Sequence, residues 1–196
     1  MNTKSQGVGL AANKDSIAVL DENGNVAVFN NKGELQWKKE FNTPFRNSPL
    51  LANNTLYLLS SSNDLWALEA KTGKEKWHYK TTESQTLLQG MGSPAVANDV
   101  LVVPFSTGEI IGFVATTGSL LWSQDLIGEK IFSAIAQLSQ MTASPVIERG
   151  IVYLVGHNGK TLAVNLKTGE SLWQLPRGGQ NTPLISGNAL DRKSVV

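Results

Sequence analysis

Short apolar runs alternate with polar turns along the whole chain. The runs are rich in Val, Ile, Leu, Tyr and Phe, and clear examples are residues 56–59, 101–103 and 151–154. Asn, Gly, Ser and Asp separate them at intervals of about eight to twelve residues, which is the spacing of strands joined by tight turns. The pattern predicts an all-β chain, and no apolar stretch reaches the roughly 18 residues of a membrane-spanning helix.

Four tryptophans give this pattern a longer period. They are Trp37, Trp77, Trp122 and Trp173, so the intervals are 40, 45 and 51 residues (37 to 77, 77 to 122 and 122 to 173). A glycine stands four residues before each tryptophan and a small residue stands ten before it. The glycines are Gly33, Gly73, Gly118 and Gly169, and the small residues are Ala27, Ala67, Gly112 and Ala163.

A repeat of this length is typical of a four-stranded β-propeller blade. Helical repeats can be equally long, but the strand-like runs and frequent turns argue against them. Each repeat offers one strand after a Ser-Pro or Thr-Pro pair, one apolar strand, one strand before the glycine and one that carries the tryptophan. Proline is tolerated at the start of a strand because no ladder hydrogen bond is lost there. The pairs are Ser48-Pro49, Ser93-Pro94, Ser144-Pro145 and Thr182-Pro183.

The recurring small residues follow from backbone geometry. A hairpin turn needs a residue with positive φ, and glycine adopts it without steric cost, so the four glycines before the tryptophans are structural. The residue fourteen positions before each of these tryptophans is Asn or Gly, which also tolerate the left-handed region. These residues mark the turn between the second and third strands of each repeat. These are Asn23, Asn63, Gly108 and Gly159.

The tryptophans themselves are expected to join neighbouring repeats. A small residue ten positions earlier leaves room for an indole to pack flat, and burying an indole removes about 200 Å² from water. Stacking of these indoles on a ligand is the alternative. Trp66 shares its register with Val26, Ile111 and Leu162, so it is expected to fill an ordinary apolar position.

The segment Ala-Leu-x-x-x-Thr-Gly-x-x-x-Trp at residues 67–77 resembles the repeat of the PQQ-like propellers, which have eight blades. Among these, the chain is similar to the BamB-like family of outer-membrane β-barrel assembly lipoproteins over about residues 8–190. The more specific likeness is a pair of loops, residues 85–90 and 127–141, each ahead of a Ser-Pro pair.

The resemblance implies four blades of eight. We expect one partial propeller over residues 1–190, with repeats at about 8–41, 46–81, 91–126 and 142–175 and another beginning at 182. Four open blades would leave two unpaired sheet edges, so we expect a fragment. Residues 191–196, Asp-Arg-Lys-Ser-Val-Val, are expected to be a non-native tail.

The resemblance also implies a function. BamB-like proteins are non-catalytic scaffolds that bind the POTRA region of the barrel-inserting subunit and assist delivery and insertion of outer-membrane proteins, which are themselves expected partners. They lie at the periplasmic face of the outer membrane and are attached to it through an N-terminal lipid anchor, which we expect to lie outside this chain. Delivery by strand addition and positioning of the POTRA domains remain alternative mechanisms.

The partner-binding residues are carried over from the two loops. The corresponding positions are Thr86, Leu87, Leu88 and Gln89 in the first loop, and Gln140, Met141 and Thr142 in the second. Where the family has Leu, Leu and Arg, this chain has Thr86, Leu88 and Gln89, with Leu87 between. Where the family has two aspartates, it has Gln140 and Thr142, so apolar contacts and polar hydrogen bonds replace ion pairs.

Both loops also have a simpler interpretation. Leu87 and Leu88 could instead cover the edge of a blade core. Ile131, Ile135 and Leu138 stand at helical spacing within residues 127–141, and this predicts a short amphipathic helix that caps the propeller.

Composition narrows the remaining functions. The chain has 17 basic and 16 acidic residues, a formal charge of +1 and no cysteine. It shows no basic patch for nucleic acid, no thiol nucleophile and no cysteine metal site. Both histidines, His78 and His157, lack a partner at metal-ligand spacing and are expected at the surface.

No cofactor, metal or catalytic residue is therefore expected, and the chain is expected not to be an enzyme. Two other functions stay open. One is a quinoprotein dehydrogenase, whose propeller holds pyrroloquinoline quinone and calcium, and the other is an extracytoplasmic sensor or adhesion propeller. Calcium ligands with a catalytic aspartate would indicate the dehydrogenase. A fused membrane helix or a second domain would indicate the sensor or adhesion propeller.

Overall fold

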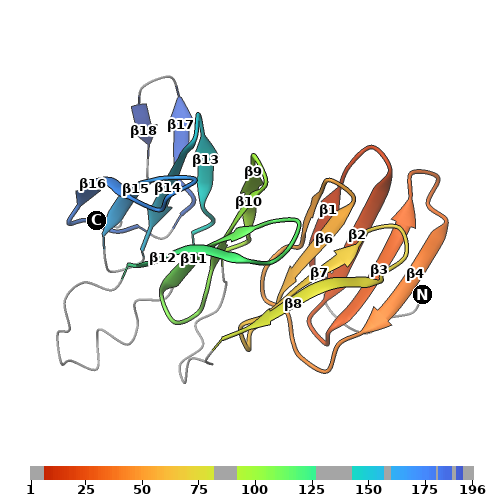
Figure 1. The fold of residues 1–196 in the computed structure, drawn as a ribbon. Helices are drawn as coiled ribbons and strands as arrows, with labels where there is room; N and C mark the ends of the chain where they lie inside the picture. The colour runs from red at the N-terminus through yellow and green to blue at the C-terminus, as the bar shows by residue number, and fades with distance from the viewer. Residues whose placement is uncertain are drawn as a thin grey trace. The chain divides into compact units, whose positions relative to one another are not determined.

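The computed structural model describes residues 7–81, 92–126, 143–156, 160–179, 181–186 and 189–191. The chain forms two compact units, residues 1–83 and residues 84–196, which we call unit 1 and unit 2. Strands and turns make up the described residues, and no helix occurs among them (Figure 1).

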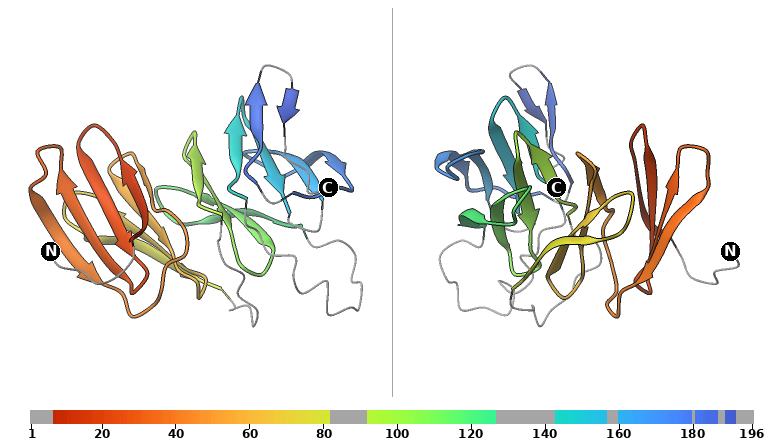
Figure 2. Two further views of the ribbon diagram at one scale, coloured as in Figure 1. Left: turned by 180° about the vertical axis from the view of Figure 1, so that it is seen from behind. Right: turned by 45° about the vertical axis from the view of Figure 1, so that its right-hand side comes forward.

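Unit 1 contains two four-stranded antiparallel sheets, here called blade 1 and blade 2. Blade 1 is β1 (Gly7–Ala12), β2 (Ser16–Asp21), β3 (Asn25–Asn30) and β4 (Leu35–Glu40). Blade 2 is β5 (Leu50–Ala52), β6 (Thr55–Leu59), β7 (Asp64–Glu69) and β8 (Glu75–Lys80). In each sheet the strands are neighbours in chain order, and Figure 2 shows the two sheets side by side.

Unit 2 repeats the arrangement with blades 3 and 4 and a further hairpin. Blade 3 is β9 (Ala95–Ala97), β10 (Val100–Pro104), β11 (Glu109–Val114) and β12 (Leu120–Asp125). Blade 4 is β13 (Val146–Glu148), β14 (Ile151–Val155), β15 (Thr161–Asn165) and β16 (Ser171–Leu175). The hairpin is β17 (Leu184–Ser186) and β18 (Ala189–Asp191), so Asp191 pairs with Leu184.

The predicted all-β class of propeller blades is confirmed by these sheets. In every blade the tryptophan lies on the outermost strand, β4, β8, β12 or β16, directly after the glycine turn. The four turn glycines have φ between 70° and 80°, as hairpin geometry requires. The amphipathic helix expected within residues 127–141 lies outside the described residues.

The turn between the third and fourth strands is one residue shorter in blade 1 than in the other three blades. Its β3–β4 turn is closed by a hydrogen bond from Asn30 N to Glu34 O, whereas the matching turn of blade 2 runs from Glu69 N to Lys74 O. As a result Trp37 faces Val28, and the expected partner Ala27 pairs with Lys38. In blades 2, 3 and 4 the tryptophan faces the small residue ten positions earlier, as expected.

The same offset moves the left-handed residue of the β2–β3 turn. Positive φ falls on Gly24 at 91°, not on the expected Asn23, while Asn63 and Gly108 hold the matching positions of blades 2 and 3 as expected. Gly159 lies outside the described residues. The shorter hairpin accounts for the correction, because it places Gly24 thirteen residues before Trp37.

The core of unit 1 lies between its two sheets. Residues of β2 and β3 in blade 1 contact residues of β5, β6 and β7 in blade 2, together with Phe41 and Phe45 from the connection. Unit 2 has an equivalent core between blades 3 and 4. Strands such as β6 and β10 are buried throughout, which explains their uninterrupted apolar sequence.

Each of two tryptophans joins its blade to the following one. The indole Nε1 of Trp37 donates to the carbonyl of Ala70 at 2.7 Å, and Nε1 of Trp122 donates to Leu166 at 2.8 Å. In both cases the acceptor stands three residues before the turn glycine of the next blade. These two indoles thus hydrogen-bond to the neighbouring blade, and Trp66 packs against the core of unit 1.

Candidate partner-binding surface

The two candidate loops each connect the outermost strand of one blade to the innermost strand of the next. The first runs through residues 82–91 between β8 and β9, and the second through residues 127–142 between β12 and β13. All seven predicted contact residues lie within these ranges and therefore outside the described residues. The structure describes the segments that enter and leave the loops.

Both loops begin at a backbone anchor. Thr81 N donates to Asn63 O at 3.4 Å, and Leu126 N donates to Gly108 O at 3.2 Å. Asn63 and Gly108 are the left-handed residues of the β2–β3-type turns in blades 2 and 3. Each loop therefore starts beside the turn between the second and third strands of its own blade, and Leu126 adds a buried side chain to the core of unit 2.

The ends of the two loops lie together in unit 2. Ser93 N donates to the Oγ of Ser144 at 2.9 Å, which links the residues that follow the two loops. Gly92 packs so closely on Ala143 that a β-carbon at position 92 would collide with the Ala143 carbonyl. The first described residues after the two loops are thus held in direct contact.

This contact belongs to a repeating set. Ser144 N donates to Thr182 Oγ1 at 3.1 Å, so the Ser-Pro pairs of blades 3 and 4 and the Thr-Pro pair before β17 form a chain of hydrogen bonds. The sequence showed these pairs at the start of every repeat after the first, but it did not show that their hydroxyl groups bond between neighbouring repeats. Their recurrence was the signal that could have indicated it.

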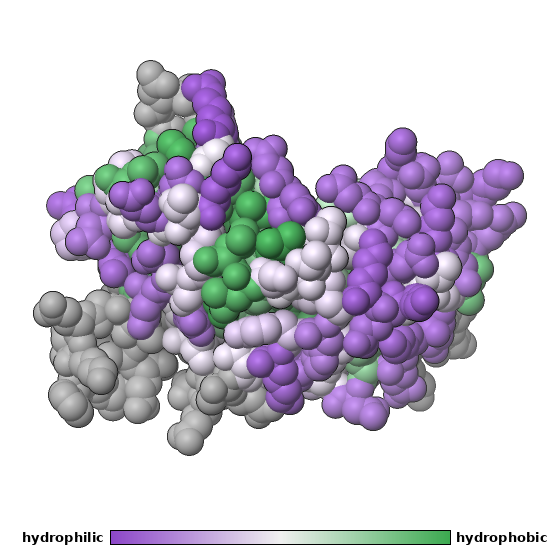
Figure 3. Space-filling view, in the orientation of Figure 1, coloured by the Kyte–Doolittle hydropathy of each residue, from purple (hydrophilic) through white to green (hydrophobic). Residues whose placement is uncertain are grey.

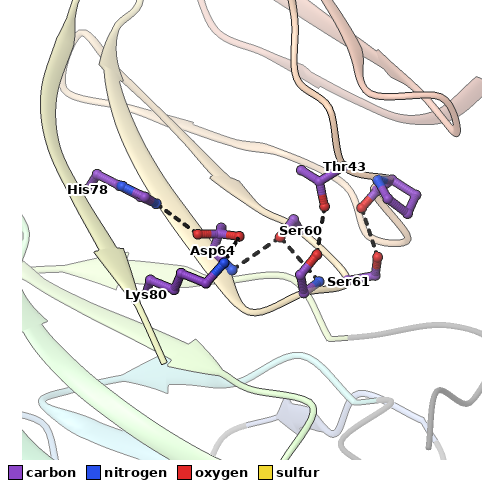
Figure 4. Close-up of polar contacts among 8 residues, drawn as sticks. Thr43, Ser60, Ser61, Asp64, His78 and Lys80 are labelled. Carbon is purple, nitrogen blue, oxygen red and sulfur yellow. Dashed lines mark hydrogen bonds and ion pairs between the residues drawn. The ribbon is translucent and has the colours of Figure 1, made fainter. Parts of the chain in front are cut away.

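A polar cluster occupies one end of blade 2 (Figure 4). The carboxylate of Asp64 lies 3.0 Å from His78 Nε2 and 3.3 Å from Lys80 Nζ, and its side chain is 10% exposed. The His78 ring stacks on Trp66 with ring centroids 5.0 Å apart. Trp66 in turn contacts Phe41 and Phe45.

This cluster ties two strands together. Asp64 begins β7, and His78 and Lys80 come from β8, so the hydrogen bond to His78 and the ion pair with Lys80 connect the two outer strands of the blade. Ser60 Oγ accepts from the backbone N–H groups of Ser62 and Asp64 and closes the preceding turn. The His78 side chain is 35% exposed, at the surface as expected, whereas His157 lies outside the described residues.

Neither a metal site nor a membrane-spanning segment is found in the described part of the chain. No group of three or more His, Cys, Asp and Glu side chains there could hold a metal ion. Over the same residues, no helix has the length and apolar character needed to cross a bilayer.

Comparison with known proteins gives the family. The family model described as outer membrane protein assembly factor BamB matches residues 1–194. The chain belongs to the BamB family. The protein of this name from Yersinia pestis is 24% identical over 183 residues, which are 93% of this chain and 47% of the relative. The chain thus spans about half the length of this curated BamB relative.

Solved structures agree on the fold. The crystal structure of BamB from Moraxella catarrhalis superposes with a TM-score of 0.83 at 18% identity and covers 94% of this chain and 56% of that chain. A europium-containing methanol dehydrogenase superposes with a TM-score of 0.72 at 14% identity, covering 89% and 43%. Likeness at these identities shows the propeller fold alone.

Proposed function

We propose that this chain is part of a non-catalytic scaffold of the outer-membrane β-barrel assembly machine. In this proposal, residues 86–89 of the first loop and 140–142 of the second bind the POTRA region of the barrel-inserting subunit and so assist delivery and insertion of outer-membrane proteins. The protein acts at the periplasmic face of the outer membrane, anchored through a lipid-modified N-terminus outside this chain. Membership of the BamB family supports the assembly role.

The hydrogen bond between Ser93 N and Ser144 Oγ is the observation that carries the proposal. It holds the ends of both loops together on the rigid sheets of unit 2. A binding surface needs a few apolar and hydrogen-bonding groups in fixed positions, and loops on a β-scaffold provide this. Leu87, Leu88 and Met141 supply the apolar contacts, and Thr86, Gln89, Gln140 and Thr142 supply the polar ones.

The test replaces the two leucines of the first loop. A chain with Leu87→Ala and Leu88→Ala is titrated with the purified POTRA region, and we expect at least a tenfold loss of affinity because apolar anchors dominate such interfaces. The melting temperature should stay unchanged. If it falls clearly, these leucines instead cover the blade core and the proposed contact is wrong.

The chain contains a matched control. Leu120 and Leu121 are also adjacent leucines, are 54% and 43% exposed, and lie on β12. Replacing both by alanine should leave POTRA binding as in the unmodified chain. Equal losses from the two double variants would show nonspecific apolar adhesion and would contradict a loop-mediated contact.

A further inference from the structure

The turn between β2 and β3 contains an asparagine–glycine pair, Asn23 and Gly24. Asn23 is exposed, and its backbone N–H donates to the Asp21 carboxylate at 3.0 Å. Gly24 is buried and has φ of 91°. The residues that precede the left-handed position in blades 2 and 3, Ser62 and Thr107, are partly exposed as well. Solvent access at this position is therefore a property of the turn.

The asparagine side chain and the following backbone nitrogen are placed for an internal reaction. Glycine carries no β-carbon, so its nitrogen can approach the preceding side-chain carbonyl carbon without steric obstruction. In the described part of the chain, Asn23 is the only asparagine that a glycine follows. The Gly24 nitrogen donates to Asp21 O at 3.3 Å, which is long for a hydrogen bond of this kind. The surface of blade 1 visible in Figure 3 is almost entirely polar and open to water.

We propose that Asn23 is a site of spontaneous deamidation. The Gly24 nitrogen forms a bond to Cγ of Asn23 and gives up its proton, while the bond from Cγ to Nδ2 breaks and ammonia leaves with that proton. Water, the only co-reactant, then opens the resulting five-membered succinimide at one of its two carbonyl carbons. Opening at Cγ produces aspartate. Opening at the backbone carbonyl carbon produces isoaspartate, in which the main chain runs through the former side chain.

The isoaspartate product disturbs a contact of the unit 1 core. Gly24 O accepts from Phe41 N at 2.8 Å, and an added β-carbon on Gly24 would lie only 2.1 Å from Phe41 O. Phe41 is buried in that core, with its ring centroid 4.9 Å from that of Trp66. Isoaspartate lengthens the main chain by one carbon directly before Gly24 and displaces the glycine from Phe41. The aspartate product keeps the normal main chain and adds a charge at an exposed position.

Peptide mapping by mass spectrometry tests the site on the chain as it exists. Samples are aged in mildly alkaline buffer, one folded and one unfolded in urea. We expect a gain of one mass unit at Asn23 in both, because O–H replaces the amide nitrogen and its hydrogens. The folded chain should react more slowly, since the turn must open first. If Asn23 stays unmodified in the folded chain after the urea sample has reacted completely, the proposal is overturned.

The chain contains a matched control asparagine. Asn98 is exposed in the β9–β10 turn with φ of 49°, but Asp99 follows it. Asn98 should stay unmodified while Asn23 reacts, and equal rates at the two positions would contradict the role given to glycine. The other asparagine–glycine pair of the sequence, at residues 158–159, lies outside the described residues and is read from a separate peptide.

Urea unfolding measures the structural consequence. Chromatography separates the aged isoaspartate form from the aspartate form, and Asn23→Asp reproduces the aspartate form directly. We expect Asn23→Asp to unfold at the same urea concentration as the unmodified chain and the isoaspartate form to unfold at a lower one. Asn23→Ser, which has the residue of the matching position in blade 2, should show neither the mass change nor the loss of stability on ageing. Equal midpoints for Asn23→Asp and the isoaspartate form would overturn the proposed effect on the Phe41 contact.

Discussion

The six-membered ring of Trp37 lies directly against Gly73, where a β-carbon would stand 2.8 Å from Cδ2. Gly73 therefore serves two purposes, because it allows positive φ in its own hairpin and leaves space for the indole of the preceding blade. Gly33, in the same unit, serves only the first purpose. Comparing substitutions at Gly73 and Gly33 therefore separates two contributions to the free energy of unfolding, the strain of positive φ and the disturbed packing of the indole.

Gly73→Ala should destabilise unit 1 more than Gly33→Ala does. Both changes place alanine at positive φ, which costs about 1 to 2 kcal/mol. Only Gly73→Ala also displaces Trp37, which adds about 1 to 3 kcal/mol as overpacking. Urea unfolding followed by circular dichroism measures both. Equal losses would show that the indole contact contributes nothing to stability.

The buried hydroxyl of Ser60 gives a second prediction, on the polar cluster of blade 2. Ser60→Ala removes the acceptor of two backbone N–H groups, those of Ser62 and Asp64, and should cost about 1 to 3 kcal/mol. Lys80→Ala removes an ion pair whose lysine side chain is 56% exposed and should cost less than about 1 kcal/mol. Thermal or urea unfolding of the two variants checks the order, and the reverse order would contradict a structural role for the turn.

The sequence predicted the blades because their signals are local. A glycine stands four residues before each of the four repeat tryptophans, and a Ser-Pro or Thr-Pro pair stands before β5, β9, β13 and β17. These are properties of one hairpin or one strand start. The sequence did not predict the shorter β3–β4 turn of blade 1. The spacing from Gly33 to Trp37 is the same as in the other blades, and the turn is shorter by one residue on the N-terminal side of Gly33. Asn30 closes that shorter turn by accepting from Lys32 N and Glu34 N through its side chain.

Contacts between repeats were harder to predict than the repeats themselves. The tryptophan spacing indicated a contact between blades, but the acceptors Ala70 and Leu166 depend on how consecutive sheets stack. The bond from Ser93 to Ser144 joins residues 51 positions apart, and the recurrence of the pairs indicated a shared role without showing that the N–H of one pair bonds the hydroxyl of the next. The seven loop residues came from resemblance, and they stay a prediction.

Ser144 offers a test of how the two loops are coupled. Ser144→Ala leaves Ser93 N without its acceptor and loosens the side-chain bond between the two loop ends, at a cost of about 1 kcal/mol. We expect weaker POTRA binding with little change in melting temperature. Ser123→Ala on β12 is the control, since its hydroxyl bonds Glu109 within the same blade. Unchanged affinity for Ser144→Ala would show that the loops bind independently of this link.

The chemistry of the loops predicts weak salt dependence for partner binding. None of the seven proposed contact residues is charged, and the family pattern of arginine and aspartates is replaced by glutamine and threonine. Screening acts on interactions between charges and leaves apolar contacts and neutral hydrogen bonds largely unaffected. The Kd for the POTRA region should therefore change by less than about threefold between about 50 and 500 mM NaCl. Isothermal titration at both salt concentrations measures this.

Restoring a charge through Gln140→Asp should reintroduce salt dependence if the partner presents a cation at that site. A tenfold weakening of the unmodified chain at high salt would mean that charges outside these loops bind the partner.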